Sequence, residues 1–396
     1  MEAERGGAGL ASPSAAVHAS VTTLPAFARL APEWDGLVLS SSRPSPFLLH
    51  GWLTAWIREF LGEGELHVET LRRDGKLVAA LPLCVRRQRG IRRIEFLGGS
   101  ESALADLLVS AGSGSVPAFA LIDQIGEIDH DFADLFGLTG GSRLEQALAP
   151  GQLRLIKRVE APVLELPDGW EAAYEKKVSS KHRYAQRRKL RRLGELGSVE
   201  FRVSRGLEEL RPALEDAFAV HHLRWEGRPD GSEFGSVYGM AFHREALEAI
   251  APAGIPRILT LVLDGRPIAF SYYLLLGQRM YSHRLGFDPA FARFSVGRAA
   301  ALESIAEASR EGAERVEFLG GAESYKMELA DRVEPLYEGI GFARTLRGHA
   351  AVAARCATIA ARKRLKRSQL LHRLYLEGVM PTRRLADRPH EGRERV

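Results

Sequence analysis

The chain has 396 residues, of which 45% are hydrophobic and 27% are charged, a balance typical of soluble globular proteins long enough for two domains. Its two cysteines, Cys84 and Cys356, are too few for a disulfide framework and fit a reducing compartment. No stretch approaches the roughly 18 apolar residues of a membrane span, and no basic segment followed by an apolar one opens the chain. These features exclude a disulfide-rich secreted protein and predict a cytoplasmic one.

The first predicted elements follow a lead-in of about residues 1–20, which is rich in Ala, Gly and Ser and is predicted to be disordered. Asp74-Gly75 then predicts a hairpin, because this dipeptide tolerates the positive φ angles of a tight turn. A strand, a helix and a strand are expected next, at 93–99, 116–124 and 134–137. This series predicts a first domain at residues 21–165.

A second series of the same kind is predicted further along the chain. Asp264-Gly265 separates two strand-rich runs, 258–263 and 268–276. A third strand ends in Leu285-Gly-Phe-Asp-Pro289, a helix begins with Phe294-Ser-Val-Gly-Arg298, and a last strand leads into Phe318-Leu-Gly-Gly321 and Ser324-Tyr-Lys326. The recurrence predicts two similar α/β (α+β) domains in tandem, each a mixed, largely antiparallel sheet flanked by helices, with the second at residues 166–348.

Gly297 lies where the predicted helix of the second series begins. A glycine lets the chain approach a ligand closely, and the first turn of a helix presents free backbone N–H groups and the positive end of the helix dipole. Such a helix end favours an anion, and a pyrophosphate is a common one. A glycine at a strand-to-helix junction also occurs without any ligand.

The order of these elements resembles the acyltransferases of the GNAT superfamily, specifically the CelD-like group associated with cellulose biosynthesis, which is related to the Fem peptidyltransferases. The resemblance covers about residues 30–345 and includes Trp52, Trp56 and the run His221-His-Leu-Arg-Trp225. It implies GNAT-like domains that use acetyl-CoA or another acyl-CoA as the co-substrate. The first domain lacks a counterpart to Ser295-Val-Gly297 and to Tyr325-Lys326, so we expect it to be a degenerate copy that shapes the acceptor groove. No metal is expected.

The resemblance implies that the pyrophosphate of coenzyme A lies at the start of the second-series helix. The residues expected there are Phe294, Ser295, Val296, Gly297, Arg298 and Ala299. Gly297 and Ala299 match the last two positions of the superfamily's pyrophosphate loop. Phe294 stands where that loop has Arg or Gln, and Arg293 is one place early, a departure that fits a weaker donor site or the use of aminoacyl-tRNA.

Acyl transfer to an amine needs the loss of a proton from the acceptor and gains from a proton on the leaving thiolate. Tyr325 stands where the superfamily often places a tyrosine beside the thiol, so it is the candidate acid; a partly buried structural tyrosine is the alternative. Lys326 could hold a phosphate or a carboxylate, or could be a plain surface lysine. His221, His222 and His283 are the candidate bases, although the alternation along the strand favours a core position for His283.

The helix predicted at Lys181–Leu193 is strongly basic: seven Lys or Arg residues and no acid lie between Lys181 and Arg192, and Arg183, Arg187 and Arg191 form one stripe. Like charges at this spacing repel by a few tenths of a kcal/mol per pair, so an anionic partner would relieve them. Coenzyme phosphates, an acidic glycan precursor, tRNA, a membrane surface or simple solvation remain open. Arg183 and Arg187, with Arg224 and Trp225, are the candidate substrate-binding residues; the limited aromatic content argues against DNA.

The C-terminal segment 349–396 is predicted to be a basic helical tail. Residues 343–396 carry 14 Lys or Arg and 4 Asp or Glu, a net of +10, whereas the whole chain carries +5. Residues 354–376 combine apolar and basic positions at helical spacing, which fits either contact with an anionic bilayer or packing on the second domain. A peripheral membrane location is therefore a possible addition to the cytoplasmic one.

Three functions follow from these patterns. The first is acyl transfer from acyl-CoA to an amine or hydroxyl, on a small molecule or a saccharide precursor of the envelope. The second is a Fem-like ligase that uses aminoacyl-tRNA. The third is a catalytically silent scaffold in polysaccharide assembly. No residue pattern distinguishes between acceptors.

Overall fold

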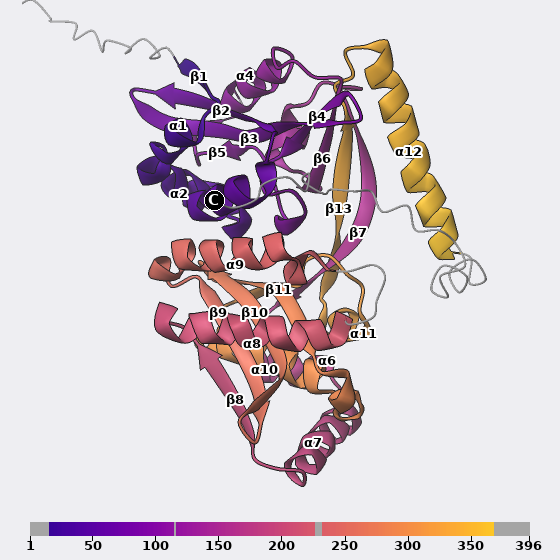
Figure 1. Ribbon diagram of the computed structural model, residues 1–396. Coiled ribbons are helices and arrows are strands. Elements are labelled where there is room, and N and C mark those ends of the chain that lie inside the picture. Colours follow the sequence, from indigo (N-terminus) through magenta and orange to yellow (C-terminus); the bar gives the residue numbers. More distant parts are fainter. Residues whose placement is uncertain (1–15, 115, 226–231, 368–396) are drawn as a thin grey trace, which may run out of the picture.

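The computed structural model of the chain describes residues 16–114, 116–225 and 232–367. Within them, one mixed sheet of thirteen strands runs through the molecule, with helices on its faces (Figure 1). The strand order is β1-β2-β3-β4-β6-β13-β7-β12-β11-β10-β9-β8, and β5 pairs with β3. The strands are β1 Val17–Val21, β2 Glu65–Arg73, β3 Lys76–Gln88, β4 Ile91–Phe96, β5 Leu108–Val109, β6 Phe132–Thr139, β7 Leu153–Glu165, β8 Val199–Ser204, β9 Pro256–Leu263, β10 Arg266–Leu276, β11 Arg279–Phe287, β12 Arg315–Glu317 and β13 Arg332–Gly341.

Twelve α-helices accompany the sheet in the described residues. They are α1 Leu24–Ala28, α2 Ala31–Ser40, α3 His50–Trp56, α4 Val116–Ile125, α5 Arg143–Ala147, α6 Gly169–Lys177, α7 Ser180–Gly194, α8 Leu207–Trp225, α9 Val237–Ile250, α10 Val296–Arg310, α11 Ser324–Leu329 and α12 Leu346–Arg367. None of them has the length and apolar character needed to cross a membrane.

Both predicted series are present. Asp74-Gly75 joins β2 to β3 and Asp264-Gly265 joins β9 to β10, and all four residues have positive φ, as the sequence predicted for tight turns. In each series a third strand, a helix and a fourth strand follow, namely β4, α4 and β6 in the first half and β11, α10 and β12 in the second. The prediction of a tandem α/β fold with mixed sheets flanked by helices is confirmed.

The two halves share strands, which the sequence did not reveal. Here the first half means residues 16–152 and the second half residues 166–331. β13 follows the second half in sequence but pairs with β6 of the first half and, along its whole length, with β7. β7 in turn pairs at its end with β12 of the second half. The two sheets are therefore continuous, and the predicted domain limits stay a prediction.

Both ends of the described chain differ from expectation. β1 begins at Val17, inside the stretch expected to be a disordered lead-in, because Val17–Val21 pairs with β2 and His18 lies 2.7 Å from the buried carboxylate of Glu69. At the other end, α12 packs on β4 and β6 of the first half and on β13 rather than on the second half. Ile359 joins Phe132 and Ile340 in a small core there. The predicted tail beyond residue 367 lies outside the described residues.

A single apolar core lies between the halves. α3 of the first half packs against α9 of the second so closely that a Cβ on Gly51 would lie 2.7 Å from the Cβ of Ala249. The rings of Trp52 and Phe242 meet edge to face, with centroids 4.9 Å apart. Fully buried aromatic rings of this kind stabilise an interface strongly, so the halves are held in a fixed relation.

Candidate functional site

The N-terminus of α10 is formed as the sequence predicted. Asp288 follows β11 and accepts the N–H of Ala290 at 2.9 Å, and Ser295 adopts a left-handed φ of 56° that turns the chain into the helix. The first intrahelical bond is donated by Ala299 to the carbonyl of Ser295, at 3.0 Å. The N–H groups of residues 296–298 therefore precede the hydrogen-bonded part of this 15-residue helix.

Gly297 is needed for packing in this structure. It is buried, and a Cβ at this position would lie 2.6 Å from Cδ1 of Phe287. Phe287 ends β11, so its ring lies directly beside the first turn of α10. The close approach that the sequence predicted at Gly297 is thus made by a protein side chain, and contact with a ligand there stays a prediction. Phe294 is buried, and the Arg293 guanidinium lies 4.7 Å from its ring centroid.

Three cationic side chains gather around this helix end. Lys189 of α7 donates to the Ser295 hydroxyl at 2.8 Å. Arg224, at the end of α8, lies 4.8 Å above the Phe287 ring and donates to the carbonyl of Leu285 at 3.4 Å. Arg298 pairs with Glu328 at 2.7 Å. The positive end of the helix dipole and these cations together favour an anion.

A gap opens between β11 and β12 next to this helix end. The two strands are parallel and pair only between residues 279–281 and 315–317. Beyond this point the chain after β12 follows β7, since Phe318 donates to Pro162 and Gly321 to Glu160. β11 continues to Phe287 and keeps only β10 as a partner strand. Its edge from Ser282 to Phe287 therefore faces the gap.

Tyr325 lies close to the start of α10, since the charges of Arg224 and Arg298 both act on its hydroxyl. It is the second residue of α11, and its ring meets that of Phe318 edge to face with centroids 6.2 Å apart. Burial raises the pKa of its hydroxyl, and the Glu323 carboxylate adds to this, while Arg224 and Arg298 act in the opposite direction. The structure thus brings Tyr325, Arg224 and the start of α10 together, and the tyrosine stays protonated at neutral pH.

Lys326 does not face the gap in this conformation. Its side chain is buried, lies 3.0 Å from the Glu323 carboxylate and approaches the carbonyl of Gly320 at 3.4 Å. It holds the loop between β12 and α11. A role in orienting a ligand stays a prediction and would require Lys326 to leave these partners.

The candidate bases lie on the junction side of the second half. His221 is buried, its ring contacts Phe234, and Trp225 stacks on it at 5.8 Å. His222 is exposed, and its Nδ1 lies 2.9 Å from the Phe218 carbonyl. Burial, followed by the nearby charge of Arg284, lowers the pKa of His221 to about 4. His221 is therefore neutral at pH 7 and is a weaker base than an ordinary histidine.

This lowered pKa makes a prediction about stability. Because His221 binds a proton more weakly in the folded state, its contribution to stability is present above pH 6.5 and is lost as the pH falls to about 4. We expect His221→Gln to flatten this part of the profile of unfolding free energy against pH, measured by urea denaturation. His222→Gln is the comparison variant and should change the slope less than His221→Gln does, because it removes only a smaller influence on His221. An identical slope in all three proteins would contradict the assignment.

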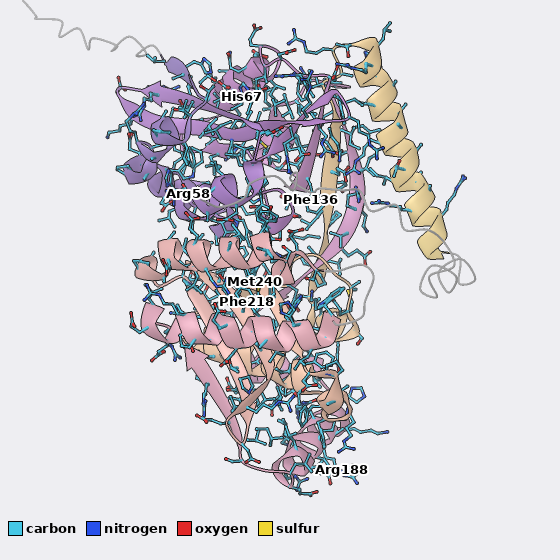
Figure 2. All side chains as sticks on the ribbon, viewed as in Figure 1. Arg58, His67, Phe136, Arg188, Phe218 and Met240 are labelled. Atoms are coloured by element: carbon cyan, nitrogen blue, oxygen red, sulfur yellow. The ribbon has the colours of Figure 1, made fainter. Side chains whose placement is uncertain are left out.

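Arg183 and Arg187 of α7 lie in different surroundings. Arg183 caps α6, because its Nη1 donates to the carbonyls of Glu175 and Val178 at 3.0 and 2.8 Å. Arg187 is exposed. Figure 2 shows Arg188 at the end of the molecule remote from Phe136 of the first half. The basic helix thus flanks the start of α10, and substrate contacts of Arg183 and Arg187 stay predictions.

A pocket of about 430 Å³ lies where the halves meet. It opens at the point where β4 and β6 part, since these strands pair only at residues 93–94 and 132–133. Its charged side chains are Arg86, Arg93, Arg158, Arg355, Glu95, Asp134, Glu233 and Glu338, and its rings are Trp56, Phe60, Phe96, Phe136 and Tyr238. Arg355 of α12 lies 2.8 Å from both Asp134 and Glu338. Sequence reasoning missed this pocket, because its residues come from seven separate segments of the chain.

This junction pocket adjoins the gap on two sides. Glu233 lines it, and the neighbouring Phe234 contacts His221. Arg158 also lines it, and the next residue, Val159, lies 3.2 Å from where a Cβ on Gly320 would be. The loop after β12 thus separates the pocket from the gap.

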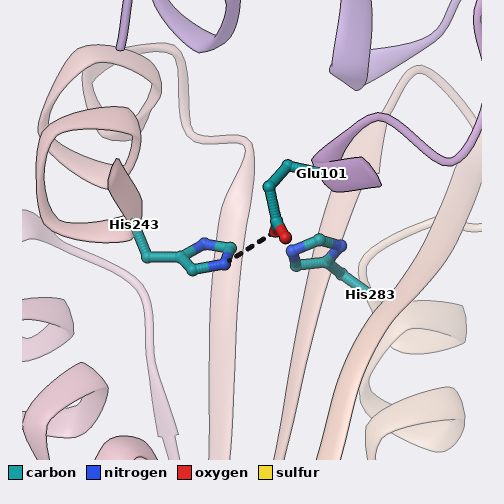
Figure 3. Close-up of side chains that lie close together, drawn as sticks. All are labelled: Glu101, His243 and His283. Carbon is teal, nitrogen blue, oxygen red and sulfur yellow. Dashed lines mark ion pairs between the residues drawn. The ribbon is translucent and has the colours of Figure 1, made fainter. Parts of the chain in front are cut away.

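A cluster of three ionisable side chains lies beneath the pocket, in the apolar core. Glu101, His243 and His283 are buried and each directs one ligating atom toward the others (Figure 3). The sequence offers His283 either as a candidate base or as a core residue, and the structure places it in the core. Glu101 and His243 were missed, because neither lies in a recognisable pattern and only the junction brings them together.

Comparison with known proteins gives a family match for part of the second half. Residues 180–327 match the family model of the acetyltransferase (GNAT) domain. No match to the chain was found among curated proteins. Among solved structures, FemX is similar with a TM-score of 0.56 and 12% identity, over 78% of this chain and 95% of FemX.

Two further structures share the fold. The C-terminal domain of a putative lysylphosphatidylglycerol synthetase from Agrobacterium fabrum has a TM-score of 0.53 and 14% identity, over 84% of this chain and 96% of that one. L-PGS from Bacillus licheniformis has a TM-score of 0.52 and 12% identity, over 82% and 96%. The prediction of a GNAT-type acyltransferase enzyme is confirmed by the domain that residues 180–327 form.

Proposed function

We propose that the chain moves an acyl group, preferably acetyl, from acyl-CoA to an amine or hydroxyl acceptor. The observation that carries this proposal is the separation of β11 from β12 beside the start of α10, together with the nearness of Tyr325 to Arg224 and Arg298. The domain match over residues 180–327 supports it.

The donor would lie in the gap with its diphosphate at the first turn of α10. The N–H groups of residues 296–298 and the cations Lys189, Arg224 and Arg298 supply donors and positive charge. Phe294 stands where the superfamily's pyrophosphate loop has Arg or Gln, and Lys189 would supply the polar contact that Phe294 lacks. The two amides in the arm of coenzyme A could pair with the edge of β11, as an added strand does. Arg224 would then leave the Leu285 carbonyl.

The reaction would form a bond between the acceptor and the carbonyl carbon and break the bond from carbon to sulfur. Tyr325 would give its proton to the departing sulfur. The acceptor proton would leave to water or to His221, which is neutral at pH 7. Preorganised groups at the carbonyl would lower the barrier further.

The acceptor would bind in the junction pocket. Its volume of about 430 Å³ suits a small molecule, and its rings and alternating charges suit a polar one such as a saccharide precursor. Membership of the CelD-like group, a role in exopolysaccharide or envelope biosynthesis, and a cytoplasmic location all belong to this proposal. Membrane contact would have to use the tail beyond Arg355, since Arg347 and Arg355 already pair with acids of the first half.

A Fem-like reaction with aminoacyl-tRNA is the second candidate. The similarity to FemX and the basic surface of α7 favour it. A silent scaffold is the third candidate, and the same experiment tests it.

The deciding experiment is a thermal-shift titration with acetyl-CoA on wild type and Arg224→Ala. A donor at 100 times its dissociation constant should stabilise the fold by about 2.7 kcal/mol. We expect a clear shift for wild type and a dissociation constant about tenfold or more weaker for Arg224→Ala, because one charge-assisted contact is lost. Arg211→Ala is the control, since Arg211 pairs with Glu208 and Glu248 on the surface.

Two other results would favour the alternative functions. No shift with any acyl-CoA, together with binding of aminoacyl-tRNA, would favour the Fem-like reaction. Binding of neither would favour the scaffold.

A further inference from the structure

Three side chains from separate parts of the fold converge in the core between the halves. Glu101 ends the short turn Gly99–Glu101 after β4, His243 lies in α9 and His283 in β11. Their exposed fractions are 1%, 0% and 7%. One ligating atom of each lies within 4.8 Å of the others, and Figure 3 shows the Glu101 carboxylate between the two imidazole rings.

Most of the polar atoms in this cluster lack a hydrogen-bond partner. Both ring nitrogens of His283, both of His243 and Oε1 of Glu101 are buried without one among the described residues. Nε2 of His243 lies 3.1 Å from Oε2 of Glu101 but is not aligned for a hydrogen bond. Each unsatisfied buried polar group costs about 1–3 kcal/mol, and native proteins rarely leave several together.

The chemistry of the set fits a metal ion. Burial lowers the pKa of both His243 and His283, so both rings are neutral and present a lone pair. The guanidinium of Arg284 lies 2.6 Å from Oε2 of Glu101 and orients the carboxylate from outside, as an outer partner of a metal ligand commonly does. Oε1 remains available for an ion.

The charge balance selects the kind of ion. The positive charge of Arg284 already neutralises Glu101, so a hard cation such as Mg²⁺, which depends on carboxylates, is disfavoured. Imidazole nitrogen binds Zn²⁺ well and needs no further acid. Bonds of about 2.0–2.2 Å to nitrogen and oxygen require small inward rotations of the three side chains. A water molecule or the buried hydroxyl of Tyr272, whose ring lies 5.2 Å from that of His283, could complete four ligands.

We propose that Glu101, His243 and His283 form a closed Zn²⁺ site that joins the two halves of the molecule. One ligand comes from the first half and two from the second, so the ion cross-links them beneath the junction pocket. The surrounding rings of Phe47, Trp52 and Tyr272 exclude solvent, so the role is structural. This inference departs from the sequence-based expectation of no metal and does not depend on the proposed acyl transfer.

The test uses untagged full-length protein, first stripped with chelator and then dialysed against Zn²⁺ or Co²⁺. We expect about one equivalent of Zn²⁺ per chain by elemental analysis, the d–d absorption of tetrahedral Co²⁺, and a melting temperature that rises on Zn²⁺ addition. His283→Gln should lose at least nine-tenths of the bound metal and all of the thermal shift. His222→Gln, at an exposed histidine, should behave as wild type.

Two results would overturn the proposal. One is folded wild type that takes up neither ion. The other is full metal content in His283→Gln. If His283→Gln does not fold, the Co²⁺ spectrum of wild type decides alone. The expected spectrum has the d–d bands of a tetrahedral site with nitrogen and oxygen ligands and no absorption from a sulfur ligand.

Discussion

Tyr325→Phe is expected to reduce turnover by about 100-fold or more while leaving donor affinity nearly unchanged. The substitution removes only the hydroxyl that would protonate the departing sulfur, and general acid catalysis contributes about 10²–10⁴-fold. The ring, which packs edge to face on Phe318, is retained. The measurements are thiol release during turnover of acetyl-CoA with the best acceptor found, and the dissociation constant of acetyl-CoA.

Tyr174→Phe is the matched control for this experiment. Tyr174 is partly buried against the same core as Tyr325, but it stacks on Trp170 in α6. Its substitution should alter neither quantity. Equal losses of turnover and donor affinity in Tyr325→Phe would identify a structural tyrosine, and unchanged turnover would show that the sulfur receives its proton elsewhere.

Glu101→Ala is expected to destabilise the fold by about 3–5 kcal/mol, measured by urea denaturation in the presence of chelator so that no metal contributes. Although burial alone would raise the pKa of Glu101, the charge of Arg284 holds it at about 2. Removing this buried carboxylate leaves the Arg284 guanidinium without its partner at 2.6 Å. Breaking one side of a buried ion pair has a cost of this size.

The control is Glu215→Ala, which removes an exposed carboxylate from its pair with Arg244 at 2.7 Å. Exposed pairs contribute up to about 1 kcal/mol, so the two losses should differ by several fold. Similar losses would mean that solvent reaches the cluster and that the two halves are less tightly joined than the structure indicates. Glu101→Gln, which keeps the shape, should fall between them.

The shared strands explain why the junction can hold a functional site. β7 and β13 pair with each other along most of their length and bind both halves. The junction pocket, the gap beside Tyr325 and the buried histidines are consequently fixed relative to one another. A hinge between two separate sheets would not hold an acceptor and a donor in register, and proximity of this kind is a large part of catalysis.

The sequence by itself determined the local elements. The Asp-Gly turns at residues 74 and 264 and the start of α10 at Val296 follow from turn chemistry and periodicity, which depend on neighbouring residues. The order of these elements supported a tandem α/β fold, and its resemblance to the GNAT superfamily predicted a GNAT-type enzyme. The resemblance also named Tyr325 and Arg224 as site residues, and their roles stay predictions.

Only the tertiary structure decided what depends on residues far apart in the chain. Four features carry no local signal in the sequence. They are the pairing of β7 with β13, the burial of Lys326 against Glu323, the contact of Phe287 with Gly297 and the contact of Glu101 with His243. Burial and long-range pairing set these positions, because the free energy of a contact depends on which surfaces the whole fold removes from water.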